Sequence, residues 1–332
     1  MKKGLVNDVE IIKAVDVLSK EEIKSLPKWV KKDLKNSKIV GKSKRVVETS
    51  NGKRYHLNNR LNDLNGAEWS YFLRSVFSTR YSTKGEESYA HNIRKMHPSP
   101  KPPQLMEELI RFFSKENQWV LDYFAGVGGT LLGASLSNRN AIGIDLDKKY
   151  KNAYKDANSS LGLNEQHFLV GDSLKLLKQK TKIKKILGNK KFHLIAIDPP
   201  YGDMLSRKKT GEASKKLKNS DATPFTTLKE DLGNMKYEKF LESIHESIKD
   251  AMSMLANKGY LIVFTKDMQP TPENPNLLHS DLINKIITIN NIEYRGMKIW
   301  SDESINLYPY GYPYAFSMNQ LHQYILIFRK VD

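Results

Sequence analysis

Four short apolar runs, each followed closely by an aspartate, dominate the middle of the sequence. They are residues 119–121, 141–144, 167–170 and 194–197. Near-continuous apolar runs of this length are typical of parallel strands buried on both faces. The segments between them that have the length and pattern of helices are 130–137, 148–161 and 173–187. This alternation predicts an α/β fold with a doubly wound, Rossmann-like parallel sheet.

The alternation of helices and strands resumes after an insert that follows residue 201. A polar insert at 202–234 is followed by a helix whose apolar positions include Phe240, Ile244 and Ile248, and by strands at 260–264 and 323–328. We therefore expect one catalytic domain over residues 91–332. Residues 1–90 are expected to form a basic appendage, with polar helices at 20–26 and 27–34.

Five aromatic residues fall between residues 61 and 90. They are Trp69, Tyr71, Phe72, Phe77 and Tyr81. A group of this kind either packs into a core or offers a surface on which bases stack. We expect core packing, because aromatic side chains are more often used that way.

The excess of positive charge lies in three segments of a chain whose net charge is +17. Residues 1–60 carry 16 Lys/Arg against 7 Asp/Glu, residues 173–191 carry eight lysines and no acid, and residues 206–220 carry six Lys/Arg and one Glu. Clustered charge of one sign is typical of a surface that meets a polyanion. The alternative is a set of solvated helix faces in a lysine-rich chain.

The composition also excludes some classes of site. The chain has no cysteine, so it has no disulfide framework, no thiolate metal site and no cysteine nucleophile. We expect no metal site. No apolar run reaches the ~20 residues that span a bilayer, and the N-terminus lacks the apolar region of a secretory signal. We expect a cytoplasmic protein with no membrane contact.

The first chemical motif is a glycine-rich turn after the strand that ends near Asp122. It reads Asp-Tyr-Phe-Ala-Gly-Val-Gly-Gly-Thr over residues 122–130, so a helix opens at Thr130. Glycine lets the backbone approach a ligand, and the helix N-terminus offers free N–H groups. The spacing is not Gly-x-Gly-x-x-Gly, which disfavours a dinucleotide pyrophosphate.

Two acids follow at the ends of the next two strands. Asp145 lies about twenty residues beyond the glycines, where a carboxylate accepts hydrogen bonds from both ribose hydroxyls. Asp172 follows the next strand and is placed to contact an adenine edge. Three ordered motifs at successive strand ends predict a site for an adenosyl group.

The fourth motif is Asp198-Pro199-Pro200-Tyr201. The two prolines keep the backbone extended and lack N–H donors, so carbonyl groups and a polar side chain face one point. An exocyclic amine is a poor nucleophile, because its lone pair is delocalised into the ring. A carboxylate and a carbonyl that accept both N–H bonds localise that pair, and Tyr201 can stack on an extruded base. The alternative is a Pro-Pro turn that only ends a strand.

At these residues the sequence resembles the DNA amino-methyltransferases, which methylate adenine N6 or cytosine N4. The glycine motif with Phe124, Gly126 and Gly128 and the Asp-Pro-Pro-Tyr motif carry the resemblance. A segment His-Pro-Ser-Pro-Lys-Pro at residues 97–102, with the closing strand at 323–330, extends it over roughly residues 65–332. The implied fold is the Rossmann-like S-adenosylmethionine-dependent methyltransferase fold.

The resemblance also implies roles for individual residues. Those expected to bind S-adenosylmethionine are His97, Pro98, Lys101, Asp122, Phe124, Gly126, Gly128, Thr130, Asp145 and Asp172. Those expected to carry catalysis are Asp198, Pro199, Pro200 and Tyr201. Aspartate at the head of the last motif favours adenine over cytosine, where serine is commoner.

The expected substrate is DNA, and a restriction endonuclease or a specificity subunit is an expected partner. Family members with this motif order usually carry a large target-recognition region after the catalytic motif, whereas residues 235–332 here are mostly used by the closing helices and strands. Recognition then falls to the insert 202–234, to residues 1–90, or to both. In the insert, the residues expected to contact DNA phosphates are Arg207, Lys208, Lys209, Lys215, Lys216 and Lys218. The sequence predicts no oligomeric state.

Three rival functions share part of this pattern. Asp-Pro-Pro-Tyr-Gly also occurs in RNA methyltransferases that act on guanine N2, although these usually carry a dedicated RNA-binding domain. A protein-glutamine methyltransferase would normally have Asn at position 198. A catalytically inactive DNA-binding member of a restriction complex would not need both Asp198 and Tyr201.

Overall fold

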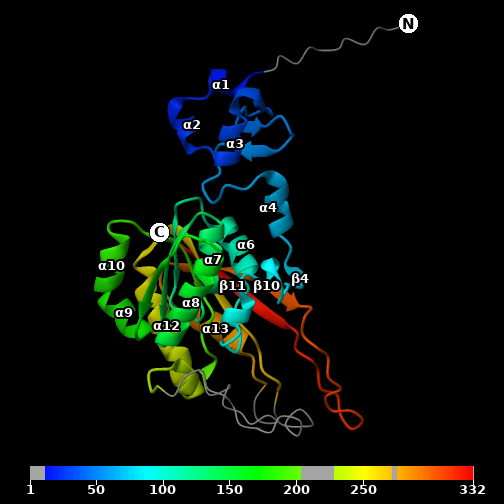
Figure 1. Cartoon of the computed structure of the whole chain (residues 1–332), viewed down its shortest axis with the longest axis vertical. Coiled ribbons are helices and arrows are strands. Elements are labelled where there is room, and N and C mark those ends of the chain that lie inside the picture. Colours follow the sequence, from blue (N-terminus) through cyan, green and yellow to red (C-terminus); the bar gives the residue numbers. More distant parts are fainter. Residues whose placement is uncertain (1–11, 203–227, 271–274, 332) are drawn as a thin grey trace.

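The computed structural model describes residues 12–202, 228–270 and 275–331. The described chain forms a small N-terminal unit and a large α/β unit, connected near residue 60 (Figure 1). The large unit contains the four strands predicted around residues 119–197, each within two residues of its expected bounds.

The large unit is built on an eight-stranded sheet with the order β4-β10-β11-β9-β8-β5-β6-β7. Its strands are β4 (Val76–Thr79), β5 (Trp119–Asp122), β6 (Asn140–Asp145), β7 (His167–Val170), β8 (Phe192–Ile197), β9 (Leu255–Thr265), β10 (Ile292–Asp302) and β11 (His322–Lys330). Strands β5 to β9 pair in parallel, and β11 runs antiparallel to both of its neighbours. The fold is therefore the predicted Rossmann-like methyltransferase fold.

Side chains of the central strands alternate between two hydrophobic clusters on opposite faces of this sheet. In β5, Leu121 belongs to one cluster and Val120 to the other, and in β8 Ile195 and Leu194 divide in the same way. Successive side chains of a strand point to opposite faces, so a sheet covered on both sides needs apolar residues at every position. This explains the continuous apolar runs in the sequence.

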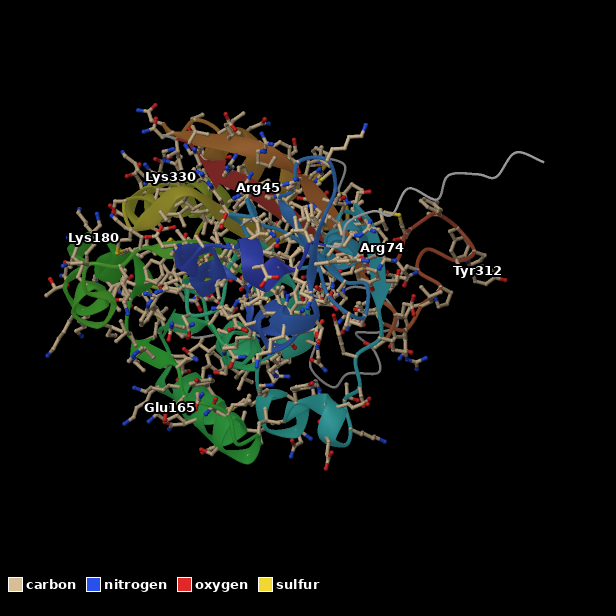
Figure 2. The ribbon with its side chains drawn as sticks, turned by 90° about the horizontal axis from the view of Figure 1, so that it is seen from above. Arg45, Arg74, Glu165, Lys180, Tyr312 and Lys330 are labelled. Carbon is tan, nitrogen blue, oxygen red and sulfur yellow. The ribbon has the colours of Figure 1, made fainter. Side chains whose placement is uncertain are left out.

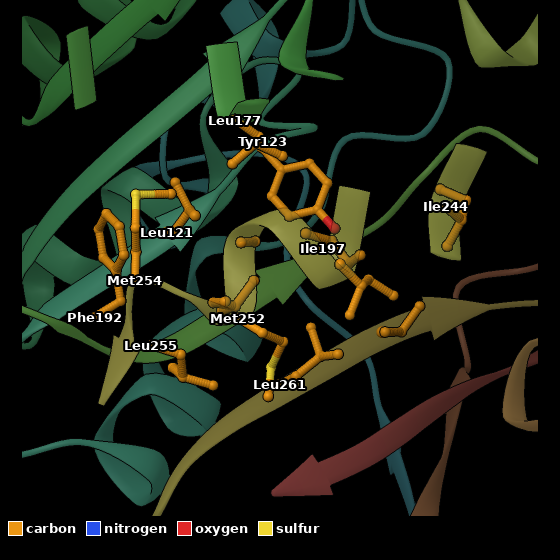
Figure 3. Packing of buried hydrophobic residues seen from close by; sticks show 14 of the residues in the cluster. Leu121, Tyr123, Leu177, Phe192, Ile197, Ile244, Met252, Met254, Leu255 and Leu261 are labelled. Carbon is orange, nitrogen blue, oxygen red and sulfur yellow. The ribbon is translucent and has the colours of Figure 1, made fainter. Parts of the chain in front are cut away.

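Helices cover both faces of the sheet. The first face packs against α9 (Ser173–Gln179), α10 (Thr181–Leu187), α12 (Tyr237–Met252) and α13 (Leu278–Ile286). The opposite face packs against α6 (Pro103–Phe113), α7 (Gly129–Leu136) and α8 (Lys148–Ser160). Figure 3 shows the first cluster, where Leu121 and Leu261 of the sheet meet Leu177, Ile244 and Met252 of the helices.

The long basic helix predicted at 173–187 is two helices. Lys180 has a left-handed backbone, with φ +61°, and separates α9 from α10. A left-handed residue cannot continue an α-helix, so the axis changes direction there.

The small unit has its own core and a sheet that the sequence did not predict. It contains α1 (Ala14–Val17), α2 (Lys20–Ser25), α3 (Lys28–Lys32), η1 (Leu34–Asn36) and an antiparallel sheet of β1 (Lys38–Val40), β2 (Val46–Glu48) and β3 (Arg54–His56). Val30, Ile39, Val47 and Tyr55 are buried in its centre. The helices expected at 20–26 and 27–34 are confirmed, apart from small differences at their ends.

Residues 61–90 pack against the large unit. They contain α4 (Gly66–Phe72), β4 and η2 (Glu86–Ser88), and α5 (His91–Arg94) follows. Trp69, Phe72, Phe77 and Tyr81 pack against the second cluster, as expected for core aromatics, whereas Tyr71 is exposed. Because β4 pairs with β10, the large sheet takes in a strand from the region that the sequence assigned to the appendage.

Candidate functional site

A cavity of about 930 Å³ lies at the carboxyl ends of the central strands. Strand order reverses at β5, which lies between β6 and β8, and open α/β sheets bind ligands at such a point. Most of the predicted site residues line this one cavity: His97, Pro98, Lys101, Asp122, Phe124, Gly126, Thr130, Asp145, Asp172, Asp198, Pro199, Pro200 and Tyr201.

Asp122 holds the glycine turn in shape. Its carboxylate accepts a hydrogen bond from the Phe124 amide at 3.0 Å and one from the Thr130 hydroxyl at 2.5 Å. Burial raises the pKa of Asp122 to about 7, because the charged form is removed from water. The aspartate therefore connects the end of β5 to the first turn of α7.

The two glycines predicted to bind the cofactor have different surroundings. Gly126 lines the cavity, with φ +48°, and a Cβ built on it would lie 3.2 Å from Nε2 of His97. A Cβ on Gly128 would collide with the ring of Tyr154 from α8. Gly128 is outside the cavity lining, so its visible function is to let α8 pack against the turn.

Asp145 connects the second strand end to the first. One carboxylate oxygen accepts a hydrogen bond from the Gly126 amide at 2.8 Å, and the other accepts one from the Asp147 amide at 3.1 Å. Burial raises the pKa of Asp145 to about 6. Each oxygen retains acceptor capacity toward a ligand in the cavity.

Asp172 is the N-cap of α9. Its Oδ1 atom accepts hydrogen bonds from the amides of Leu174 at 2.9 Å and Lys175 at 3.3 Å. Capping uses the carboxylate as an acceptor for free helical N–H groups, which stabilises the start of the helix. The residue also lines the cavity, and its predicted contact with adenine stays a prediction.

The catalytic motif and the His-Pro segment meet at Asp198. Lys101 Nζ lies 2.5 Å from Oδ2 of Asp198 and donates a second hydrogen bond, of 2.9 Å, to Oε1 of Gln323. The Tyr201 hydroxyl lies 3.4 Å from Oδ1 of the same aspartate. Lys101 was predicted to bind the cofactor. In the structure its ammonium group bonds to Asp198, the residue predicted to accept hydrogen bonds from the target amine.

His97 forms one wall of the cavity as a neutral ring. It lies edge-on to Tyr150, with ring centroids 4.9 Å apart. Burial is the main cause that lowers the pKa of His97 to about 4, so the ring carries no charge at neutral pH. Its Nδ1 atom accepts a hydrogen bond from the Ser99 amide at 3.2 Å.

Several cavity residues were missed in the sequence. Arg94 is buried, and its guanidinium donates to the backbone carbonyls of Tyr89 and Lys101, which fixes the His-Pro segment. Lys266 follows β9 and lines the cavity, so the strand-end rule that found Asp198 would also have found it. Nothing in the sequence distinguishes Arg94 from the surrounding charged residues.

The six basic residues predicted to contact DNA lie outside the described residues. They are Arg207, Lys208, Lys209, Lys215, Lys216 and Lys218. In the described part of the chain, no helix is both long enough and apolar enough to span a membrane.

Two family profiles match parts of the sequence. The sequence profile of the N6/N4 DNA methylase family matches residues 14–156. The profile of a family described as conserved hypothetical protein 95 matches residues 106–222. The chain thus resembles the DNA amino-methyltransferases, as its motifs indicated.

The curated relatives include a tRNA methyltransferase and a type II methyltransferase. The tRNA (guanine(10)-N2)-dimethyltransferase of Methanocaldococcus jannaschii is 30% identical over 155 residues, which are 45% of this chain and 42% of the relative. The type II methyltransferase M1.MboII of Moraxella bovis is 35% identical over 79 residues, 24% of this chain and 30% of that protein. The chain thus spans less than half the length of these relatives.

Among solved structures, TrmN from Thermus thermophilus has a TM-score of 0.46 and 15% sequence identity, over 74% of this chain and 53% of that chain.

Proposed function

We propose that this protein is an S-adenosylmethionine-dependent methyltransferase that methylates adenine N6 in DNA. The observation that carries the proposal is the position of Asp198, Pro199 and Tyr201 in the same cavity as Asp145 and Gly126. One cavity thus combines a motif suited to an exocyclic amine with strand ends suited to an adenosyl group. Its volume of about 930 Å³ leaves room for a nucleoside and a base together.

The residues around β5 and β6 fit the cofactor. Gly126 has no side chain to fill the turn, and Asp145 presents both carboxylate oxygens at the end of β6. We expect Asp145 to accept the ribose hydroxyls, Asp172 to contact the adenine edge, and Phe124 to line the adenosyl site. His97 and Pro98 would enclose the methionine part.

The bound cofactor supplies a methyl group activated by its positively charged sulfur. Asp198 and a carbonyl of the proline pair accept the two N–H groups of the target amine, which frees the nitrogen lone pair for attack. With the cofactor bound, the nitrogen would accept its methyl group and would then release one proton to water. Tyr201 holds the target base by stacking on a ring removed from its helix.

Methyl transfer to cytosine N4 would use the same hydrogen-bond acceptors. Methylation of cytosine instead of adenine would therefore differ in how the base is recognised and not in how the methyl group is transferred. A guanine-N2 activity on RNA is the second candidate. It is supported by the relative from Methanocaldococcus jannaschii, whose name gives that reaction. Asp198 would accept the amine in each case.

The decisive experiment measures tritiated methyl transfer to DNA and to tRNA, followed by nucleoside analysis of the product. We expect N6-methyladenine in DNA. N4-methylcytosine would move the proposal to the cytosine alternative, and N2-methylguanine in tRNA would replace DNA by RNA. No product with either nucleic acid, in a protein that binds S-adenosylmethionine, would contradict the proposal.

Substitutions of Asp198 and Tyr201 test their proposed roles in catalysis. Asp198→Ala should abolish methylation while cofactor binding is retained, because the acceptor is used mainly in the transition state. Tyr201→Ala should lose much of the activity, whereas Tyr201→Phe keeps the aromatic face and part of the turnover. Near-normal turnover of Asp198→Ala would contradict the mechanism.

Target recognition and partners follow from the same proposal. We expect the insert 202–234, residues 1–90 or both to read the DNA, with a restriction endonuclease or a specificity subunit as partner. Purification of the protein with its neighbouring gene products, followed by methylation of defined duplexes, tests this expectation.

A further inference from the structure

A loop rich in exposed aromatic side chains joins β10 to β11. We call residues 305–318 the tyrosine loop. Its sequence contains Tyr308, Tyr310, Tyr312, Tyr314 and Phe316. The four most exposed large hydrophobic side chains of the described residues belong to it: Tyr314 at 94%, Phe316 at 92%, Tyr312 at 80% and Leu307 at 69%. A concentration of this kind on a soluble surface usually marks a contact with another molecule.

The tyrosine loop has a defined shape. The amides of Tyr314 and Ala315 donate to the Gly311 carbonyl at 2.8 and 2.7 Å. Gly311 has φ +75°, and a Cβ there would collide with the Ala315 carbonyl oxygen, so only glycine fits. At the base of the loop, the Asn319 side chain accepts from the Tyr308 amide at 2.9 Å and donates to the Tyr308 carbonyl at 2.7 Å.

The loop begins at the candidate active site and projects away from it. Tyr308 and Tyr310 line the cavity that contains Asp198, and their rings lie 5.8 Å apart. The segment between β10 and β11 projects from the body of the protein (Figure 1), and Tyr312 lies at its outer end (Figure 2). A ligand that leaves the cavity along this side would therefore meet successive aromatic side chains.

Charge near the loop indicates the kind of ligand. Residues 303–321 contain one acid, Glu303, and no base, so the loop itself has no group for phosphates. The Glu303 amide bonds to the Thr79 carbonyl at 2.9 Å, which brings the segment with the exposed Arg80 and Lys84 beside it. These basic side chains therefore belong to a segment that meets the chain just before the tyrosine loop, and a combination of aromatic faces with basic side chains is what binds single-stranded nucleic acid.

We propose that Tyr312, Tyr314 and Phe316 stack on unpaired bases that flank the methylated base in the nucleic-acid substrate. The inference rests on the proposed function, because an enzyme that works on a base inside a cavity must remove that base from its stack. The neighbouring bases then lose a stacking partner. The exposed aromatic side chains of the loop that starts at the cavity replace this partner, and they tolerate any base since every base has a flat face.

Fluorescence anisotropy with a labelled single-stranded DNA oligonucleotide tests this binding mode, with S-adenosylhomocysteine present. Two triple variants separate stacking from general apolar contact: one with Tyr312→Leu, Tyr314→Leu and Phe316→Leu, and one with Tyr312→Phe, Tyr314→Phe and Phe316→Tyr. The leucine triple should weaken binding on the order of tenfold for each base released. The aromatic triple should stay near the wild-type affinity, because its rings are kept.

The control is Tyr294→Ala, an exposed tyrosine near the opposite end of β10. It should leave affinity for the oligonucleotide unchanged. All variants should bind S-adenosylhomocysteine as the wild type does, which shows that the cavity is intact. Affinity for a matched single-stranded RNA should fall by the same factor in the leucine triple. A wild type that binds RNA more tightly than DNA would support the role of the loop and would make RNA the substrate.

Three results would overturn the inference. The first is unchanged affinity of the leucine triple, and the second is an equal loss in both triples. The third is a wild-type dimer that becomes a monomer in the leucine triple with unchanged oligonucleotide affinity, because the loop would then join two copies of the chain. A wild type that binds cofactor and no nucleic acid would instead contradict the proposed function itself.

Discussion

The ammonium nitrogen of Lys101 lies 2.5 Å from a carboxylate oxygen of Asp198, and the two side chains are only 10% and 21% exposed. The pair joins the His-Pro segment to the proposed catalytic motif across 97 residues of sequence. Gln323 of β11 receives a second hydrogen bond from the same ammonium group. Three separate parts of the chain therefore meet at the Lys101 ammonium group, which orients the Asp198 carboxylate.

We expect Lys101 to act on Asp198 rather than on the cofactor. Lys101→Met should lower turnover on the order of 10- to 100-fold, since misplacement of a catalytic group by about 1 Å has effects of this size. Affinity for S-adenosylhomocysteine should change little. Lys101→Arg keeps the cation and should retain more turnover. Steady-state kinetics with calorimetry check this, and a loss of cofactor affinity in proportion to turnover would restore the role predicted from sequence.

Asp145 provides a test of the cofactor site. Asp145→Ala should weaken S-adenosylmethionine binding by roughly tenfold or more, because the ribose hydroxyls lose a charged acceptor. Asp147→Ala is the matched control, since this neighbouring carboxylate caps α8. Calorimetry on both variants decides the assignment, and unchanged affinity in Asp145→Ala would reject it.

The same residue predicts how binding depends on pH. Burial raises the pKa of Asp145 to about 6, so the ionised acceptor predominates only above that pH. Cofactor affinity should therefore fall as the pH is lowered through 6. Affinities measured from pH 5 to pH 8 test the direction, and Asp145→Ala should show a flatter profile than the wild type.

The arrangement of the strand ends was predictable because parallel strands buried on both faces require unbroken apolar runs, and polar residues after them are easy to see. Asp145 and Asp198 were found in this way. The interaction between Lys101 and Asp198 was not, because it joins side chains from distant segments whose approach depends on tertiary packing. Gly128 was interpreted as a ligand-binding residue, which stays a prediction, and the structure adds that its lack of a side chain makes room for Tyr154.

Short strands and local breaks in helices could not be predicted from the sequence. Strands β1, β2 and β3 have three residues each, too few for an alternating pattern to stand out. The break at Lys180 was invisible in the sequence because lysine is a good helix former, although its backbone is left-handed in the structure. The sequence from Gly311 onward predicted only a turn before the last strand. The exposure of the aromatic side chains in the tyrosine loop became clear only from the structure.

Asp122 should make stability depend on pH. Its pKa is raised to about 7 by burial, so between pH 4 and pH 7 the folded chain holds a proton that the unfolded chain has released. The resulting stabilisation is complete at low pH and is lost as the pH rises through 7. The free energy of unfolding should fall by at most about 1.4 kcal/mol per pH unit from this group.

Asp122→Asn removes the titrating group while keeping its size. Urea unfolding at pH 5, 6, 7 and 8 should give a flatter dependence in this variant than in the wild type, without cofactor present. Parallel curves for the two proteins would show that Asp122 does not titrate in this range.

The final prediction concerns Lys215, Lys216 and Lys218, which lie outside the described residues and follow the catalytic motif closely in sequence. If these lysines bind DNA phosphates, neutralising each one should reduce the slope of log affinity against log salt by about one unit. Their combined change to glutamine should weaken DNA binding, flatten that slope and leave cofactor affinity unchanged.

A second triple variant of equal charge makes this prediction specific. Lys35, Lys42 and Lys44 are exposed on the small unit, and their change to glutamine removes the same three positive charges. The insert triple should flatten the salt slope more than this control, because its lysines follow Tyr201 and Gly202 closely in sequence. An unchanged slope and unchanged methylation in the insert triple, with a flattened slope in the control, would place the DNA-binding surface on the small unit instead.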